Sequence, residues 1–423
     1  MENNITKYLS DIGTQQPKLF TLSNGIRVVF EEGGKYPTAA IGVLAPSGAR
    51  FEDKSTSGLS HFMEHMLFQG TEHRTNLEIV AAIENVGGEV NAFTDVQDTL
   101  FYMHVPSMHV PLALEVLADM LIHPLFSEKT IQSEAKVVLQ ELYRSQDEPN
   151  DAVGEGLLRA RYGKDPLANI TLGSLESVSS FTHQDFVAYH QQHYLAPGLV
   201  ISIVGMADID ETLNALEKTF GQLPKGPTIP AWQVPVTFAK KIVVEKPTEQ
   251  VHIAMALPGY PIYSKESFGA TMVSVILGGN MSSRLFQRMR NQEPLVYAVG
   301  ASTEDFNNTG FLEISAESSA ENAGRVQEVL LEQIIKMRKD KISTVELQHA
   351  KDAVLGSLLL GMESSFNRMN RNANAIYLRG SIRNLDEIVK QINETSMELM
   401  ETVIEHVFDT SKLATSIVHG PKK

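Results

Sequence analysis

Two histidines and a glutamate stand close together in the segment His61-Phe62-Met63-Glu64-His65. Residues four apart in a helix lie on one face, with their Cβ atoms about 5–6 Å apart. If the segment is helical, both imidazoles can therefore reach one metal ion. Zinc would lower the pKa of a bound water towards about 7 and polarise a carbonyl group. Glu64, on the flank of that face, can accept the proton of this water, so the segment predicts a catalytic zinc site.

A third ligand has to come from another segment, because a catalytic zinc usually takes three protein ligands and leaves one position open. The helical pattern of residues 127–146 contains Glu134 and Glu141, which are seven residues apart and therefore on nearly the same helix face. One of the two carboxylates can bind the metal while the other orients a histidine. Their spacing alone does not choose between these roles.

The elements that position these residues are predicted from the periodicity of apolar side chains. In the first half, we expect strands at 20–31, 39–46 and 199–204, a hairpin at 88–105, and helices at 57–68, 75–86, 109–121 and 127–146. In the second half, we expect a strand at 251–257, a helix at 265–277, strands within 295–316, and helices from 322 to 408. Thr56 or Ser57 is the expected cap of the first helix. Runs of helices after pairs of strands favour the α+β class.

A proline-rich segment at residues 223–235 separates the two halves, since so many prolines exclude a helix or a central strand. We therefore expect an N-terminal zinc-binding domain at 1–223, a linker at 224–235, and a C-terminal domain at 236–423. A chain of 423 residues also exceeds the usual size of a single hydrophobic core.

The two halves repeat one pattern. Ile-Gly-Val-Leu-Ala-Pro at 41–46 resembles Ile-Ala-Met-Ala-Leu-Pro at 253–258, and Leu-Val-Ile-Ser-Ile-Val at 199–204 resembles Leu-Ala-Thr-Ser-Ile-Val at 413–418. The first match has an offset of 212 residues and the second an offset of 214. Two matches at nearly the same offset predict a duplicated domain.

Composition limits the partners. The net charge of −15 argues against nucleic acid and against anionic membranes, since both attract cations. No apolar run approaches the roughly 18 residues that span a bilayer. The chain has no cysteine, which excludes disulfides, thiolate ligands and cysteine nucleophiles. The first residues do not have the pattern of a secretory signal, so we expect a cytoplasmic protein.

A larger set of motifs resembles the signature of the pitrilysin family of inverted zinc peptidases, which includes the mitochondrial processing peptidases and insulin-degrading enzyme. The similar segments span nearly the whole chain: Gly-Ala-Arg at 48–50, residues 58–71 around the two histidines, Arg-Thr at 74–75, Asn-Ala-Phe-Thr at 91–94, residues 134–141, residues 277–286, and Arg290 followed by Tyr297.

This resemblance implies a role for each candidate residue at the metal. His61, His65 and Glu141 would bind zinc, Glu64 would be the general base, and Glu134 would be the supporting carboxylate. The helix expected at 265–277 has no His-x-x-Glu-His motif, so only the first domain should bind zinc.

Substrate contacts are implied in the same way. The edge strand that adds the peptide substrate as a further strand would consist of Asn91, Ala92, Phe93 and Thr94. Arg290 and Tyr297 would reach the substrate from the second domain, where two donors can stabilise a tetrahedral oxyanion. Without the resemblance, Arg290 would be interpreted as a solvated charge and Tyr297 as an ordinary strand residue.

The resemblance also implies an architecture and an activity. We expect two duplicated α+β domains, each a mainly antiparallel sheet packed with helices, which form one half of a clamshell around a chamber. The expected function is a zinc endopeptidase that cleaves unfolded peptides, as a homodimer, with a heterodimer with a related subunit as the second possibility. The alternative is a non-catalytic peptide-binding or regulatory subunit. Such subunits usually have a broken zinc motif, whereas the motif is intact here.

Overall fold

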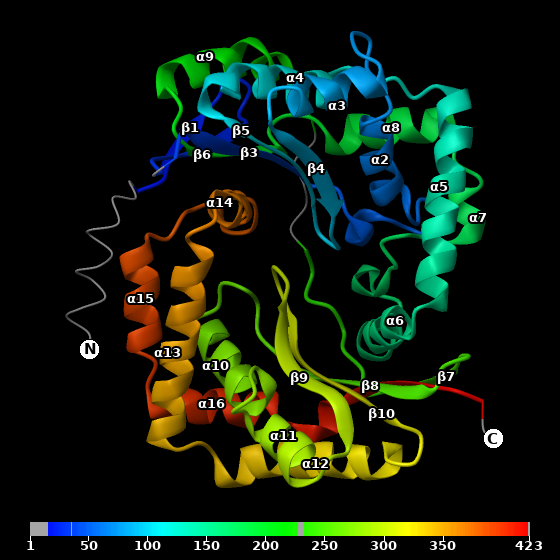
Figure 1. Cartoon of the computed structure of the whole chain (residues 1–423), viewed down its shortest axis with the longest axis vertical. Coiled ribbons are helices and arrows are strands. Elements are labelled where there is room, and N and C mark those ends of the chain that lie inside the picture. Colours follow the sequence, from blue (N-terminus) through cyan, green and yellow to red (C-terminus); the bar gives the residue numbers. More distant parts are fainter. Residues whose placement is uncertain (1–15, 35, 227–231, 422–423) are drawn as a thin grey trace. The chain divides into compact units, whose positions relative to one another are not determined.

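The computed structural model describes residues 16–34, 36–226 and 232–421 (Figure 1). They form two compact units, each assembled from three segments of the chain. The first unit takes its residues from within 1–142, 169–230 and 360–387, and the second from within 143–168, 231–359 and 388–423. Each unit contains one β-sheet with helices packed on it, which confirms the α+β class.

The sheet of the first unit has six strands in the order β1 (Lys18–Thr21), β2 (Arg27–Glu32), β6 (Val200–Gly205), β3 (Thr38–Ala45), β5 (Thr99–Pro106) and β4 (Glu89–Thr94). Only β2 and β6 are parallel, and the other neighbours are antiparallel. The expected hairpin at 88–105 is β4 and β5, which places β4 at one edge of the sheet.

The sheet of the second unit has five strands in the order β7 (Lys241–Glu245), β11 (Ala414–His419), β8 (Gln250–Pro258), β10 (Gly310–Ser319) and β9 (Val296–Asp305). This order repeats that of β2, β6, β3, β5 and β4, including the single parallel pair. The segments that match in sequence take equivalent places, because β3 corresponds to β8 and β6 to β11. The predicted duplication is therefore confirmed by topology.

The helices of the first unit are η1 (Ala49–Phe51), α2 (Leu59–Leu67), α3 (Asn76–Glu84), η2 (Ser107–His109), α4 (Val110–Ile122), α7 (Leu175–Val178), α8 (His183–His193), α9 (Ile209–Lys218), η4 (Phe220–Gln222) and α14 (Ser365–Arg379). Those of the second unit are α6 (Pro149–Tyr162), η3 (Pro166–Ala168), α10 (Ser267–Gly278), α11 (Arg284–Phe286), the π-helical η5 (Gln287–Gln292), α12 (Ala323–Asp340), α16 (Met397–Val407) and η6 (Thr410–Lys412). Three further helices span the limits between units: α5 (Glu128–Asp147), α13 (Thr344–Gly361) and α15 (Leu385–Asn393).

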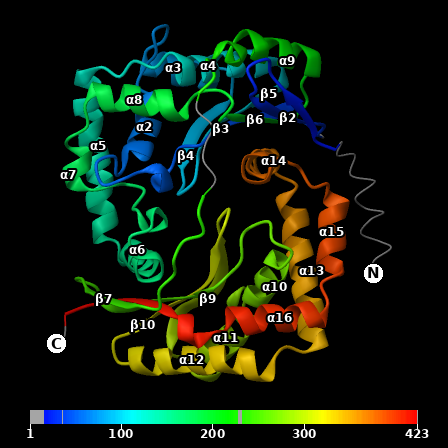
Figure 2. The ribbon, with the colours of Figure 1, turned by 180° about the vertical axis from the view of Figure 1, so that it is seen from behind.

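One complete α-helix of each unit comes from the opposite half of the sequence. Helix α14, which follows the proline-rich segment, packs on β2, β3 and β6 in the first unit (Figures 1 and 2). Helix α6, which precedes that segment, packs on β7, β8 and β11 in the second unit. Relative to the division at 224–235, the second unit therefore takes up α6 and the short η3, and the first unit takes up α14.

Close packing and a buried ion pair hold α14 on the first sheet. Gly42 allows the approach, because a Cβ atom there would collide with the sulfur of Met369. The Arg368 guanidinium donates to Glu31 Oε1 at 2.8 Å, and the Asn372 amide donates to Glu31 Oε2 at 2.7 Å. All three polar side chains are buried. A buried charge is tolerated only when it is paired, so these contacts fix the register of α14 on the sheet.

The segment 223–235 lies partly outside the described residues, and its described part forms no helix or strand apart from a single bridge between Lys225 and Ala196. Among the described helices, none is long and apolar enough to cross a membrane.

Candidate metal centre

The N-terminus of α2 is capped by the buried carboxylate of Glu52 and not by the expected Thr56 or Ser57. Its N-cap residue is Gly58, with a φ of 88°, in the left-handed region that glycine adopts without strain. Glu52 accepts hydrogen bonds from the backbone N–H groups of Gly58 and Ser60, both at 2.7 Å. The Thr56 hydroxyl instead interacts with Asp53, so the expected capping by Thr56 or Ser57 is wrong.

Glu52 is a positioning residue that the sequence interpretation missed. It also accepts from the Ser60 hydroxyl at 2.6 Å, and this hydroxyl contacts the Tyr189 hydroxyl at 2.7 Å. Burial raises the pKa of Glu52 to about 7, although the hydrogen bonds from Ser60 and Gly58 oppose this shift. No spacing rule connects Glu52 to α2, because the intervening residues form a loop whose path is visible only in three dimensions.

The apolar face of α2 anchors the helix in the core. Phe62, Met63 and Met66 are fully buried, and the ring of Phe62 packs edge-on against Phe186 at 5.0 Å. Because these residues occupy one face, the polar residues of the motif lie on the other, where they are only partly buried.

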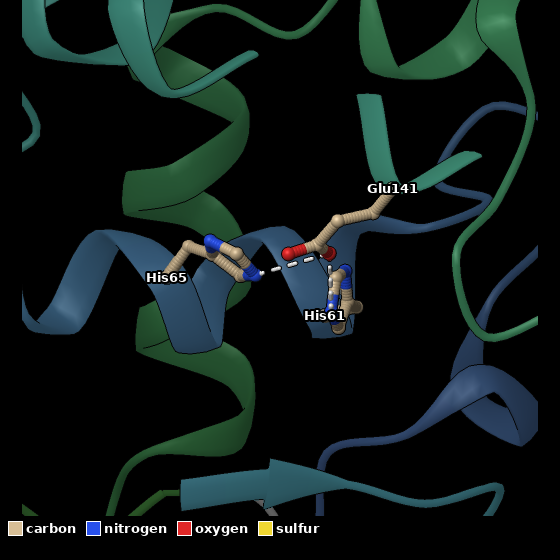
Figure 3. Close-up of side chains that lie close together, drawn as sticks. All are labelled: His61, His65 and Glu141. Carbon is tan, nitrogen blue, oxygen red and sulfur yellow. Dashed lines mark ion pairs between the residues drawn. The ribbon is translucent and has the colours of Figure 1, made fainter. Parts of the chain in front are cut away.

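Three possible ligand atoms converge beside this face of α2. His61 Nε2 lies 3.5 Å and His65 Nε2 lies 3.6 Å from the same carboxylate oxygen, Glu141 Oε2, and the three ligand atoms all lie within 4.8 Å of one another (Figure 3). Zinc bonds to nitrogen and oxygen of about 2.0–2.1 Å separate tetrahedral ligands by about 3.4 Å. The separation of each imidazole from the carboxylate therefore fits a single zinc ion.

The other nitrogen of each histidine has a different environment. His65 Nδ1 lies 2.9 Å from Glu134 Oε1. A carboxylate accepts, so Nδ1 carries the proton and Nε2 keeps the lone pair that a metal needs. His61 Nδ1 is buried and has no hydrogen-bond partner among the described residues. Thus Glu141 faces the Nε2 atoms of both imidazoles, whereas Glu134 contacts the Nδ1 atom of His65 on the opposite side of its ring.

Electrostatics favour a neutral His61. Burial, followed by the charge of His65, lowers the pKa of His61 to about 3. Burial also pulls the pKa of His65 down, but the Glu134 hydrogen bond and the charges of Glu141 and Glu64 outweigh it, so the net shift is upward. A neutral imidazole can offer its lone pair to a metal, which suits the ligand role for His61.

Glu64 stands apart from the three converging atoms. The Thr94 hydroxyl, at the end of β4, donates to Glu64 Oε2 at 2.5 Å. Burial raises the pKa of Glu64, while the Thr94 hydrogen bond partly opposes this shift. Thr94 lies on the edge strand predicted to bind the substrate, and its side chain also holds the carboxylate of the predicted base. Asn91, Ala92 and Phe93 do lie on the edge strand, where they pair with β5 on one side.

Replacing Thr94 with valine tests this positioning role. The variant should keep its zinc but lose about tenfold in kcat, because an orienting hydrogen bond of about 1–3 kcal/mol to a charged group is removed. KM should change little, and Thr94→Ser should recover most of the activity. Steady-state kinetics with parallel zinc analysis measures both; an unchanged kcat in Thr94→Val would contradict the assignment.

The second unit holds the remaining candidates. Arg290 Nη1 donates to the carbonyl oxygens of Val296 and Tyr297, both at 2.8 Å, and its guanidinium carbon lies 5.6 Å from the Tyr297 ring centroid. Tyr297 is 70% exposed. Arg290 of η5 and Tyr297 of β9 therefore form one local pair, in a different unit from the two histidines.

Family models match both halves of the chain. The model described as insulinase, peptidase family M16, matches residues 27–175, and the model described as the peptidase M16 inactive domain matches residues 180–354. The uncharacterized zinc protease YmxG of Bacillus subtilis is 32% identical over 391 residues, which cover 92% of this chain and 95% of the relative. The chain therefore belongs to peptidase family M16, and the resemblance seen in its motifs is confirmed.

Further relatives and solved structures agree. An uncharacterized zinc protease of Rickettsia felis is 30% identical, with 95% of this chain and 96% of the relative covered. The peptidase M16 inactive domain from Pseudomonas fluorescens superposes with a TM-score of 0.90 at 19% identity, covering 97% of this chain and 98% of the other. A protease from Helicobacter pylori superposes with a TM-score of 0.87 at 20% identity, covering 96% of this chain and 100% of the other. These structures support the fold.

Proposed function

We propose that this protein is a zinc-dependent endopeptidase that cleaves unfolded peptides. The observation that carries the proposal is the convergence of His61, His65 and Glu141 at separations suited to zinc, with Glu64 held beside them. The relatives are named zinc proteases, which agrees with this choice of metal. When bound, zinc would lower the pKa of a water and polarise the scissile carbonyl.

The chain's own residues would carry the proton. Glu64 Oε2 accepts the Thr94 hydrogen bond, so Oε1 is the oxygen that would take the proton of the attacking water and pass it to the leaving amine. Glu134 would keep His65 in its ligand tautomer. Arg290 and Tyr297 would contribute donors to the developing oxyanion.

The substrate would bind as an extended strand along the free edge of β4. Backbone pairing is tolerant of sequence, so the strand residues 91–94 would hold many different peptides. A compact protein cannot offer such a strand without unfolding. We therefore propose unfolded peptides, and not folded domains, as the substrate class.

We also propose that the protein works as a homodimer enclosing its substrate in a chamber, with a heterodimer with a related subunit as the second possibility. The support is the family resemblance, in which a chain of this length is one half of a clamshell. The expected cytoplasmic location stays a prediction. Native mass spectrometry should find two chains per active particle; an active monomer would contradict the dimer.

The second candidate function is a non-catalytic peptide-binding subunit. The description of an inactive domain, matched by residues 180–354, is the observation that favours it. That region, however, contains no His-x-x-Glu-His segment. Residues 27–175 contain the motif at His61 to His65. The inactive description therefore suits the second half of an otherwise catalytic chain.

A peptide library distinguishes the two candidates. The zinc-loaded protein should produce defined cuts that mass spectrometry can map, and removal of zinc by a chelator should abolish them. Restoring zinc should restore cleavage, while a stable folded protein should remain intact. Peptide binding without any cut, at full zinc occupancy, would instead support the non-catalytic subunit.

A further inference from the structure

The second sheet carries a row of small residues on the face that α6 covers. Neighbouring strands place Ser416 of β11, Ala254 of β8, Ser315 of β10 and Gly300 of β9 side by side across the sheet. At the β9 end of this row lies a cavity of about 410 Å³, lined by Asn150, Val153 and Gly154 of α6 and by residues of β8, β9 and β10. Ser416 packs against Gly156 of α6, whereas towards β9 the small residues Ser315 and Gly300 leave the space open.

Two acidic side chains flank the floor of the cavity. On β10, Glu313 and Glu317 lie two residues before and two residues after Ser315, so all three point to the same face of the sheet. Glu313 is partly buried, and its carboxylate makes no hydrogen bond or ion pair with another described residue. Burial raises the pKa of Glu313. Among the described residues of the second unit, none offsets the desolvation of this carboxylate.

A buried histidine completes the lining. His252, opposite Glu317 on β8, is only 7% exposed. Its Nδ1 lies 2.8 Å from Asn150 Oδ1 and 3.9 Å from Glu317 Oε1. Because both oxygens accept, Nδ1 carries the proton and Nε2 is left as an acceptor. Among the described residues, no partner for Nε2 is found, and the ring lines the cavity.

The ligand chemistry follows from these groups. Two carboxylates, the Ser315 hydroxyl and an imidazole lone pair all accept hydrogen bonds, and no lysine or arginine lines the cavity. An anionic ligand would be repelled, and an apolar one would leave Glu313 buried without a partner. A long side chain with a cationic tip can place its methylene groups over the small residues and its N–H donors among the acceptors.

We propose that this cavity is a specificity site that binds the lysine or arginine side chain of a peptide substrate. The proposal rests on the proposed function only in taking a peptide as the ligand. It adds a requirement that backbone pairing along β4 cannot impose, since strand pairing does not read side-chain charge. Residues of the second unit would then select among the peptides that the first unit accepts.

The test uses the full-length, zinc-loaded Glu64→Gln protein, so that binding is measured without cleavage. The probe is a fluorescein-labelled peptide of alanine and serine with one arginine, and its twin carries citrulline, which has nearly the same shape but no charge. Fluorescence anisotropy should show binding about tenfold tighter for the arginine peptide. In the double variant Glu313→Gln with Glu317→Gln, the ratio of the two affinities should fall to about one.

A matched control removes two charges from the same unit at exposed positions away from the cavity. Glu321→Gln with Glu401→Gln should keep the full preference for arginine. Equal loss of preference in the control would assign the effect to net charge and overturn the proposal. An unchanged preference in the cavity variant, with the same melting temperature as its parent, would overturn it as well. If free agmatine binds tightly and the peptide does not compete with it, the ligand is a small amine and not a peptide. That result would also contradict the proposal.

A failure of the binding-site proposal can be distinguished from a failure of the proposed peptidase function. If the zinc-loaded wild-type protein cleaves neither peptide, yet the arginine preference depends on Glu313 and Glu317, the peptidase proposal fails and the binding site stands. If the wild-type protein cleaves both peptides equally well, and the cavity variant does the same, the site fails and the peptidase stands.

Discussion

The Glu64→Gln variant is expected to lose nearly all peptide cleavage while it retains about one zinc ion per chain. General bases contribute typically 10²–10⁴-fold to a rate, and glutamine cannot accept the proton. Zinc should stay because Glu64 is not among the three residues whose ligand atoms converge. The Thr94 hydroxyl can still donate to the amide oxygen, so the local geometry should persist.

Kinetics and metal analysis on the same preparation check this result. Glu84→Gln, at an exposed position of α3, makes the same chemical change in the same unit and should behave as wild type. If Glu64→Gln instead loses zinc as completely as His61→Ala, then Glu64 is a ligand and the role of base has to be reassigned.

The Glu141→Ala variant is expected to purify largely free of zinc and inactive, whereas Glu134→Ala should keep part of its metal. Glu141 Oε2 faces the Nε2 atoms of both histidines, while Glu134 contacts only Nδ1 of His65. Loss of a residue that supports a ligand typically costs 10–100-fold in metal affinity or activity, and loss of a ligand costs more.

Competition with a chelator of known affinity ranks the two variants directly. Glu141→Gln and Glu134→Gln serve as partners of similar size that remove only the charge. A weaker zinc affinity in Glu134→Ala than in Glu141→Ala would exchange the two roles. Equal affinity in all four variants would place the metal elsewhere.

Local patterns predicted the helix and its motif well. The spacing of His61 and His65 is a property of one helix, and so is the seven-residue spacing of Glu134 and Glu141. What the pattern left open was which carboxylate faces the histidines, since that depends on how α5 is rotated against α2. The family resemblance assigned Glu141 to the metal, and the packed structure distinguishes Glu141 from Glu134 by their contacts.

Contacts between distant segments could not be read from the sequence. Glu52 reaches α2 through a loop, and Thr94 reaches Glu64 from another element. The cavity of the second unit joins His252 to Glu317 through strand register, which a single sequence does not reveal. In each case, the residue types are ordinary and only their neighbours make them informative. Helical motifs were therefore predicted, whereas the role of Glu52 and the cavity of the second unit were found only in the structure.

The exchange of helices between the two units constrains how the chain is made on the ribosome. The first sheet is complete when β6 ends at Gly205, but its cover, α14, ends only at Arg379. Synthesis of the intervening stretch of about 170 residues takes on the order of ten to thirty seconds at about 5–20 residues per second. During that interval, the apolar face formed by Val29, Leu44 and Val200 has no helix to bury it. The nascent chain therefore offers a binding site to chaperones, and a gene cut at the proline-rich segment would yield a first half that keeps this face exposed.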